Sequence, residues 1–239
     1  MTRVSICIAT YNGENYIKEQ LDSIIAEISL DDEIIISDDY STDKTISIIK
    51  SYNDDRIKIY YNNGSKGPTY NFENALNCSL GKFIMFSDQD DIWEPNKISV
   101  ILNLLESFDL ILHDASLIDH KGKLLNKSYF SLNNSKKGIF KNLVKNSYLG
   151  CCMAFRRDVL VKVTPFPSNL IAHDIWIGIM AELYHNVKYS NASLIKYRKH
   201  SNNVTNSGGK SQFTFFFKLQ YRLILIFQLF IRSMKILLK

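Results

Sequence analysis

The sequence predicts an α/β fold in which a mostly parallel, Rossmann-like sheet is flanked by helices. Over the first 115 residues, short apolar runs alternate with segments whose apolar residues recur every three or four positions. This alternation is typical of strands and helices that build a parallel sheet. Clusters of polar residues follow the ends of the expected strands, the edge where such sheets bind ligands. The 239 residues, 46% of them hydrophobic, suffice for one large domain.

Strands are expected where the apolar runs lie, at residues 4–9, 33–37, 57–61, 83–86 and 110–113. Helices are expected between them, where apolar residues share one helical face, at residues 17–28, 46–52, 72–76 and 98–105. Ser41 or Thr42 is predicted to be the N-cap of the second helix, because hydroxyl oxygens accept hydrogen bonds from the free N–H groups of a first turn.

The second half of the chain shows a weaker alternation. A hairpin turn is predicted at residues 119–122, strands at 150–156 and 194–200, and a helix that opens with His173 and Asp174. We therefore expect one α/β domain over residues 1–206, divided into halves at 1–114 and 115–206. A short link and a helical tail over residues 211–239 follow it.

Charge is unevenly distributed along the chain. The net charge is +5, yet no Asp or Glu follows Glu182 while lysines and arginines continue to the end. A basic tail on an acidic body indicates an anionic partner for the tail. The four cysteines lack C-x-x-C spacing, which argues against a disulfide framework or zinc site and suits a reducing compartment. The strand-like start is too short for a signal peptide, so we expect a cytoplasmic protein.

The most acidic segment, residues 87–91 (Ser-Asp-Gln-Asp-Asp), follows the strand expected at 83–86. Neighbouring carboxylates raise each other's pKa, and a bound divalent cation removes that cost. Mg²⁺ and Mn²⁺ prefer oxygen ligands and also contact substrate phosphates. From these residues alone, the segment is either an Asp-x-Asp clamp on a metal–diphosphate or an acidic turn that caps the helix starting near Pro95.

Three segments, in order, carry a resemblance to a known family: residues 4–13 (VSICIATYNG), 35–41 (IISDDYS) and 87–93 (SDQDDIW). Over residues 4 to about 205 the sequence resembles glycosyltransferase family 2, with its GT-A fold. Residues 88–93 are similar to the rhamnosyltransferase-like branch, which builds bacterial surface polysaccharides such as O-antigen. The resemblance implies a metal-dependent, inverting transfer of one sugar to a lipid-linked saccharide. It favours L-rhamnose from dTDP-rhamnose, with UDP-hexoses as the alternative donors.

The resemblance also implies a nucleotide-sugar site, in which Thr10, Tyr11 and Asp39 contact the base and ribose. The alternative for Tyr11 and Asn12 is a plain turn, and the alternative for Asn71 is a solvated helix face. The full set of residues expected to contact the donor is Thr10, Tyr11, Asn12, Asp39, Asn71, Asp88 and Gln89.

Asp88 and Asp90 are the expected Asp-x-Asp pair, with Asp90 in direct contact with Mn²⁺ or Mg²⁺. Asp91 is expected either to cap the following helix or to line the sugar pocket. His200 matches a late histidine that ligates the metal or touches the diphosphate, although a lone histidine is also often structural. Arg198 and Lys199 beside it suit phosphate.

The general base implied by the resemblance is Asp174, and a helix N-terminus keeps such a carboxylate ionised. The alternative is that Asp174 is only an N-cap. His173 either shares the role of base or orients the acceptor. Trp176 is expected to stack on the acceptor sugar or to pack in the core.

The tail over residues 213–239 has two distinct faces when it is placed on a helix. Its cations, Lys218 to Lys239, share one arc, and the rest is mainly aliphatic or aromatic. Such a helix fits an anchor on an anionic membrane surface, at the inner face of the cell membrane. The alternative is a helix packed on the domain or in a dimer interface.

Other classes of protein fit less well. A sugar-nucleotide pyrophosphorylase or a NAD-dependent oxidoreductase needs a glycine-rich loop after the first strand, where Thr10-Tyr-Asn-Gly13 stands. A processive synthase needs membrane spans and a Q-x-x-R-W motif. A sugar-nucleotide-binding scaffold would require neither Asp90 nor Asp174. We expect no nucleic-acid partner.

Overall fold

The computed structural model describes residues 2–200 and 214–238, and its core is one nine-stranded sheet. The first four strands pair in parallel in the order β3-β2-β1-β4. They are β1 (Val4–Thr10), β2 (Glu33–Asp38), β3 (Ile57–Tyr61) and β4 (Phe83–Asp88). β1 and β2 read as nearly continuous apolar runs because both of their faces are buried.

The second half of the chain extends this sheet with mixed pairing. β8 (Met153–Arg156) runs antiparallel between β4 and β6 (Leu110–Ile118), and β9 (Val187–Arg198) is parallel to β6. The short β5 (Ile92–Trp93) pairs with β9, and β7 (Leu124–Asn126) pairs with β6. The predicted α/β fold is confirmed, and the parallel pairs lie mainly in its first half.

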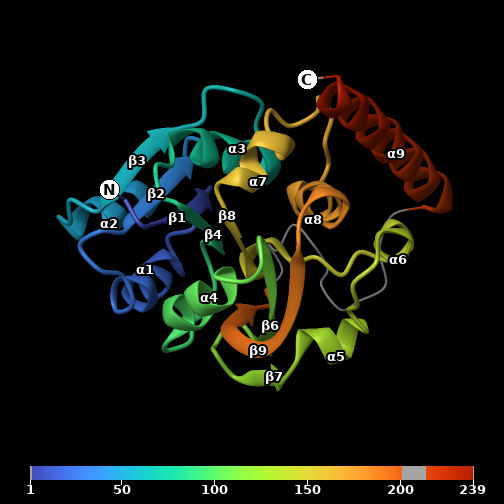
Figure 1. Ribbon diagram of the computed structural model, residues 1–239. Coiled ribbons are helices and arrows are strands. Elements are labelled where there is room, and N and C mark those ends of the chain that lie inside the picture. Colours follow the sequence, from blue (N-terminus) through green and yellow to red (C-terminus); the bar gives the residue numbers. More distant parts are fainter. Residues whose placement is uncertain (1, 201–213, 239) are drawn as a thin grey trace.

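Helices cover both faces of the sheet (Figure 1). α1 (Ile17–Ile25), α2 (Thr45–Ser51) and α4 (Lys97–Leu105) lie on one side. α3 (Pro68–Cys78), α7 (Asp158–Val163) and α8 (His173–Tyr184) lie on the other. Two short helices, α5 (Tyr129–Asn133) and α6 (Ile139–Val144), follow β7, and a 3₁₀ turn (Gly150–Cys152) precedes β8.

Three local predictions differ from the structure. α2 begins at Thr45 with Lys44 at its N-cap, because Asp43 accepts the Thr45 N–H while Ser41 binds Asp38 instead. The last strand begins at Val187, since its pairing with β6 starts there, and not at residue 194. The strand expected at 150–156 begins only at Met153, after the 3₁₀ turn. The hairpin turn at 119–122 is confirmed.

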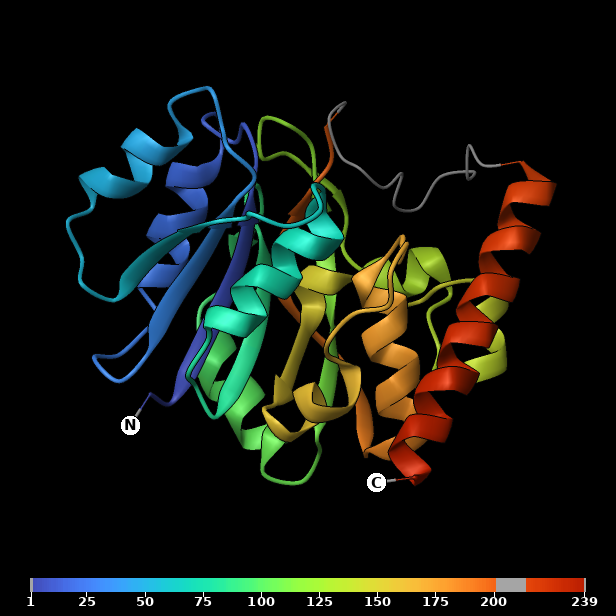
Figure 2. The ribbon, with the colours of Figure 1, turned by 90° about the horizontal axis from the view of Figure 1, so that it is seen from above.

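The tail forms helix α9 (Phe215–Leu237), which packs on the domain beside α8 and α6 (Figure 2). Its polar arc faces inward: Gln228 donates to the Ser168 carbonyl, and Arg232 to the carbonyls of Lys162 and Thr164. The predicted contact of these cations with lipid headgroups is therefore wrong for Arg232, which is held by main-chain oxygens. None of the helices in the described ranges has the length and apolarity to cross a bilayer.

Candidate active site

The carboxyl ends of β1, β2 and β4 meet at one edge of the sheet and bring the predicted polar residues together. The register places Thr10 opposite Asp38, and Ala9 opposite Asp88. Parallel strands end at the same edge, so residues far apart in the sequence share one site.

At the end of β2, a fully buried Asp38 organises the strand ends. Its carboxylate accepts hydrogen bonds from the Thr10 hydroxyl (2.7 Å) and from the Ser41 N–H (2.7 Å). The next carboxylate, Asp39, accepts from Asn62 Nδ2 (2.6 Å) and from the Gly67 N–H (2.7 Å). Asp39 is 5% exposed, so it already supports two loops around the expected nucleotide position.

Asn71 on α3 is one of the residues that the structure does bring to this edge. Its Nδ2 donates to the Thr10 carbonyl (3.1 Å), and its Oδ1 is buried with no hydrogen-bond partner among the described residues. A buried amide oxygen left unpaired costs free energy, which a ligand donor can recover. The solvated helix face considered for Asn71 is therefore wrong.

In the loop after β1, most of the groups that were expected to bind the donor form hydrogen bonds that hold the loop in place. Gln89 Oε1 accepts the Tyr11 N–H (3.0 Å), and Gln89 Nε2 donates to the Tyr11 carbonyl (3.1 Å). Asn12 has a left-handed φ of 47°, and its Oδ1 accepts the Thr42 N–H (2.9 Å). The amides of Gln89 and Asn12 therefore hold this loop in place, and their contact with the donor stays a prediction. Tyr11 is 56% exposed and remains available to stack on a base.

Behind the strand ends, Asp88 and Asp91 lie within 4.8 Å of the Cys151 thiol. Burial, and then the charge of Asp90, raises the pKa of Asp88 to about 7, and the same causes raise that of Asp91 well above its ordinary value. Asp91 Oδ1 accepts the Arg198 N–H (3.0 Å), while Oδ2 is buried without a partner among the described residues. Asp91 does not cap α4, whose N-cap is Asn96.

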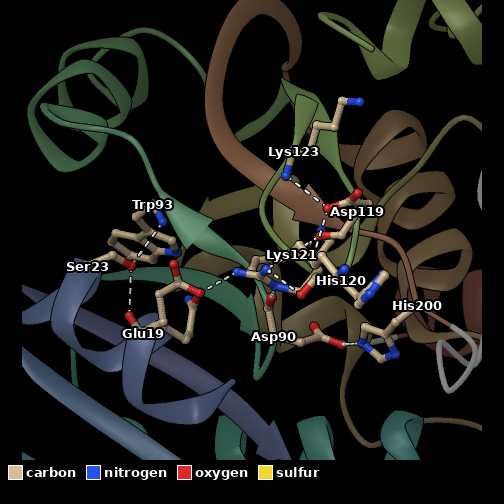
Figure 3. A network of polar contacts seen from close by, with 12 residues as sticks. Glu19, Ser23, Asp90, Trp93, Asp119, His120, Lys121, Lys123 and His200 are labelled. Carbon is tan, nitrogen blue, oxygen red and sulfur yellow. Dashed lines mark hydrogen bonds and ion pairs between the residues drawn. The ribbon is translucent and has the colours of Figure 1, made fainter. Parts of the chain in front are cut away.

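Asp90 and His200 face each other across the site (Figure 3), with His200 Nε2 2.7 Å from Asp90 Oδ2. The His200 ring stacks on Tyr16 at a centroid distance of 5.0 Å. On that same tyrosine ring the Arg198 guanidinium lies 4.9 Å from the centroid. Arg198 and His200 therefore both contact the Tyr16 ring, and the three residues are named here the Arg–Tyr–His stack.

Arg198 is almost fully buried and joins three parts of the chain. Its Nε donates to the Asp90 carbonyl (2.8 Å), and its Nη2 pairs with Glu19 on α1 (2.5 Å). The predicted phosphate contact of Arg198 is therefore wrong, because its guanidinium is used to hold the acidic loop. Sequence reasoning missed Glu19 and Tyr16, since nothing local links α1 to a strand end 179 residues away.

Lys97 is a third residue that sequence reasoning missed. It is 1% exposed, and its Nζ lies 4.0 Å from the Trp93 ring centroid and 3.4 Å from the Cys151 carbonyl oxygen. Burial lowers its pKa to about 8, and the nearby Asp91 and Asp88 oppose this effect. A cation buried behind the acidic loop offsets part of its negative charge.

These donors fit a divalent cation. Asp90 and His200 lie together, with His200 Nε2 2.7 Å from Asp90 Oδ2, whereas Asp88 lies within 4.8 Å of Asp91 and the Cys151 thiol instead. Carboxylate oxygens and an imidazole nitrogen suit Mn²⁺, and the oxygens alone suit Mg²⁺. Asp91 Oδ2, beside Asp88, has no hydrogen-bond partner among the described residues. Protein groups in that part of the chain therefore leave some of the negative charge of the acidic loop unpaired. The pKa of Asp88 is raised by burial and by the charge of the neighbouring Asp90.

Asp174 opens α8 and lies in the same site. Its Oδ1 accepts the Ile175 N–H (2.7 Å), and its Oδ2 accepts from Asn146 Nδ2 (3.2 Å). Burial raises the pKa of Asp174 to about 6, and its charge is one of the causes that raise the pKa of Asp88. A carboxylate with a pKa just below neutrality is suited to accept a proton near pH 7.

Two residues near Asp174 differ in burial: Trp176 lies in the core, and His173 is half-buried. Trp176 is fully buried and donates to the Val163 carbonyl (2.9 Å), so the predicted stacking on an acceptor sugar is wrong. The His173 ring packs on Phe72 at 4.5 Å, and burial lowers its pKa to about 3. Both roles expected for His173, a share in the base role or a contact with the acceptor, stay predictions.

Comparisons with known proteins agree with this geometry. Residues 5–164 match the family model described as Glycosyl transferase family 2. An uncharacterized glycosyltransferase of Rickettsia prowazekii is 32% identical over 216 residues, 85% of this chain and 66% of that protein. An Escherichia coli protein, the UDP-Glc:alpha-D-GlcNAc-diphosphoundecaprenol beta-1,3-glucosyltransferase WfgD, is 26% identical over 85% of this chain and 80% of its own length.

The fold also matches a solved structure. The Staphylococcus aureus TarS fragment 1–349, crystallised with UDP-GlcNAc, superposes with a TM-score of 0.71 at 22% identity. The match covers 94% of this chain and 66% of that fragment. The chain thus spans just under two thirds of the length of both the Rickettsia relative and the TarS fragment.

Proposed function

Because the chain belongs to glycosyl transferase family 2, with the GT-A fold, we propose that it transfers one sugar from a nucleotide donor to a saccharide acceptor with inversion at the anomeric carbon. The observation that carries this proposal is that the start of α8 lies against the end of β4: the ring of His173, next to Asp174, packs edge-on to Phe86, two residues before Asp88, at a centroid distance of 5.4 Å. A single displacement at the anomeric carbon requires a base on the side of the attacking hydroxyl and a diphosphate-binding cluster on the side of the leaving group.

For the donor we propose a UDP-hexose. The name of WfgD, the E. coli relative at 26% identity, specifies UDP-Glc. The relatives reported above give no support to dTDP-rhamnose, the donor that the sequence resemblance favours. Thr10, Tyr11, Asp39 and Asn71 surround the proposed nucleotide position.

For the acceptor we propose a lipid-linked saccharide, as in bacterial surface-polysaccharide synthesis. The acceptor in the name of WfgD is a diphosphoundecaprenol. We propose that the domain over residues 1–206 catalyses the transfer at the inner face of the cell membrane. The segment 211–239 then serves as its membrane-associating part; residues 201–213 lie outside the described residues.

The chain's own residues accept the proton and position the reactants. Asp174 takes the proton of the attacking hydroxyl as that oxygen bonds to the anomeric carbon and the nucleoside diphosphate leaves. Asn146 holds the Asp174 carboxylate through its amide (3.2 Å). Asp88, Asp90 and His200 would hold Mn²⁺ or Mg²⁺, which neutralises charge on the departing diphosphate when bound. The Arg–Tyr–His stack fixes His200 against Asp90.

The test is release of nucleoside diphosphate from a panel of donors, UDP-glucose, UDP-galactose, UDP-GlcNAc and dTDP-rhamnose, with Mn²⁺, with Mg²⁺ and with EDTA. We expect cation-dependent turnover of a UDP-hexose, and its loss in Asp90→Ala. Asp55→Ala, an exposed carboxylate in a loop before β3, is the matched control and stays active. Full turnover in excess EDTA, or a product with retained configuration by NMR, would contradict the proposal.

A further inference from the structure

A polar groove lies on the side of α3 that faces away from the sheet. Its floor is formed by Tyr70, Glu73, Asn74 and Asn77, which stand three or four positions apart and so share one face of the helix. One wall is the loop after β3 and the other is the loop after α7, since α3 lies between these two elements (Figure 1). The groove has a volume of about 620 Å³, in the range of roughly 300–1,000 Å³ that is typical of small-molecule sites.

The first wall, residues 62–65, is held in place by Asn62. The Asn62 amide donates to Asp39 Oδ1 (2.6 Å) and to the Ser65 carbonyl (2.9 Å), and its oxygen accepts the Gly64 N–H (3.1 Å). Asn62 is buried, so these bonds are shielded from water. This wall therefore has a fixed shape before any ligand binds.

The second wall, residues 166–169, is fixed from two directions. Glu73 Oε1 on the floor accepts the Phe166 N–H, and Gln228 of α9 donates to the Ser168 carbonyl (2.8 Å). Both bonds use main-chain groups of the wall and leave its side chains to the groove. A site that is already shaped loses little free energy in ordering itself around a ligand.

The side chains that remain available in the groove suit hydroxyl groups. Ser65, Asn77, Ser168 and Asn169 are exposed, and their side chains form no hydrogen bond with the described residues. Serine hydroxyls and asparagine amides each donate and accept, as the hydroxyls of a sugar also do. The partly exposed ring of Tyr70 adds an apolar surface on which the C–H groups of a sugar ring can pack.

The charge of the groove favours a neutral ligand. Among the described residues that line it, Glu73 is the one carboxylate, and there is no Lys, Arg or His. The Phe166 N–H occupies Glu73 Oε1, which leaves Oε2 as an acceptor for a ligand hydroxyl. A phosphate or carboxylate in this groove would meet Glu73 without a compensating cation.

The groove adjoins the candidate active site without containing its chemistry. Asn62 in the first wall is bonded to Asp39, and the second wall continues towards Asp174, with the Ile171 carbonyl held by the Thr69 hydroxyl (3.0 Å). None of the described residues that line the groove is expected to contact the donor or to act as the base. A ligand in the groove is therefore close to the reacting groups but separate from them.

We propose that this groove is a binding site for a neutral saccharide. Amide and hydroxyl side chains bind the sugar hydroxyls, and the Tyr70 ring packs against a sugar ring. In the transfer reaction the groove holds sugars of the acceptor other than the one that is glycosylated. That role rests on the proposed function, whereas saccharide binding itself does not.

The experiment is a titration of the full chain with maltotriose, cellotriose and triacetylchitotriose, followed by NMR of the protein amide signals, with no nucleotide sugar and no metal present. We expect at least one of these neutral trisaccharides to bind and to shift the side-chain amide signals of Asn77 and Asn169. Trigalacturonic acid, a trisaccharide that carries carboxylates, is expected to bind at least about tenfold more weakly because Glu73 repels it.

Two variants test the position of the saccharide. Ser168→Trp fills the groove and keeps the carbonyl that Gln228 binds, so we expect the affinity to fall by more than about tenfold. Asn77→Ala removes one amide and should lower the affinity by about fivefold. The matched controls are Ser107→Trp, in the exposed loop after α4, and Asn103→Ala, on the exposed side of α4; both lie across the sheet from the groove and should bind like the wild type.

Circular dichroism melts establish that each variant is folded. The proposal is overturned if none of the three neutral trisaccharides binds, or if Ser168→Trp binds them as the wild type does, because the saccharide then occupies another site. Binding of trigalacturonic acid as tight as that of the neutral saccharides would contradict it as well. Since the titration contains no donor, its outcome is independent of whether the chain transfers a sugar.

Discussion

At the scale of single residues, the ability of Asp174 to accept a proton depends on pH. Burial raises the pKa of Asp174 to about 6, and only its ionised form accepts a proton. We expect kcat to rise with pH, to reach half its maximum near pH 6 and to level off above pH 7. Asp174→Asn should lower kcat by about 10²–10⁴-fold with donor affinity nearly unchanged. A fully active Asn variant, measured by initial rates from pH 5 to 8, would exclude Asp174 as the base.

Tyr16 is a positioning residue for the proposed cation site. Its ring contacts both the Arg198 guanidinium and the His200 imidazole, and His200 is hydrogen-bonded to Asp90. Tyr16→Leu removes the stacking surface, so we expect Mn²⁺ affinity, measured by calorimetry without donor, to fall by about tenfold. Tyr16→Phe retains the ring and should bind Mn²⁺ like the wild type. A loss of affinity that is equal in the two variants would contradict the stacking role.

At the scale of secondary structure elements, α9 is held to the domain mainly by Arg232. Its guanidinium donates to the carbonyls of Lys162, Thr164 and Pro165 and packs on Trp176. Arg232→Ala should lower the free energy of unfolding by about 1–3 kcal/mol, since these carbonyls and the indole lose their partner. Lys235→Ala, on the exposed side of the same helix, should change it by less than about 0.5 kcal/mol. Urea titrations in which the two variants behave alike would show that Arg232 does not anchor the helix.

At the scale of the whole molecule, the acidic loop links cation binding to the stability of the fold. In the absence of a cation, burial and mutual repulsion raise the pKa of Asp88 to about 7 and that of Asp91 further above its ordinary value. A raised folded-state pKa gives stability that is present at low pH and is lost as pH rises through that pKa. The pair therefore makes the cation-free protein less stable at pH 8 than it would be with neutral side chains.

Asp91→Asn removes one of these charges and keeps an acceptor for the Arg198 N–H. We expect the melting temperature in EDTA to exceed that of the wild type, by a margin that grows from pH 6 to pH 8. The stabilisation by Mn²⁺ should be smaller in the variant than in the wild type. Thermal melts in which the margin shrinks as pH rises would contradict this linkage.

The sequence by itself determined the parallel half of the sheet and the edge that carries the site. The runs at residues 4–10, 33–38 and 83–88 are continuous and apolar because each strand is buried on both faces, and the polar residues directly follow them. Asp39, Asp88 and Asp90 stand out for the same reason, since they follow strand ends, whereas Asp174 was selected through the resemblance to glycosyltransferase family 2. Short helices such as α5 and α6 were not predicted, because fewer than two turns carry too little periodicity.

Only the tertiary structure decided which of those side chains remain available to a ligand. Arg198 and Gln89 look like ligand-binding residues in the sequence, yet the fold uses both to hold loops, through contacts to Asp90, Glu19 and Tyr11. Prediction from sequence is limited in the same way for helix α9. Its periodicity defines a polar and an apolar face but does not indicate which of them packs on the domain. The carbonyls of Lys162, Thr164 and Pro165 accept hydrogen bonds from Arg232, and so this part of the polar face turns inward and the apolar face outward. That choice depends on acceptors distant in sequence, which no local pattern contains.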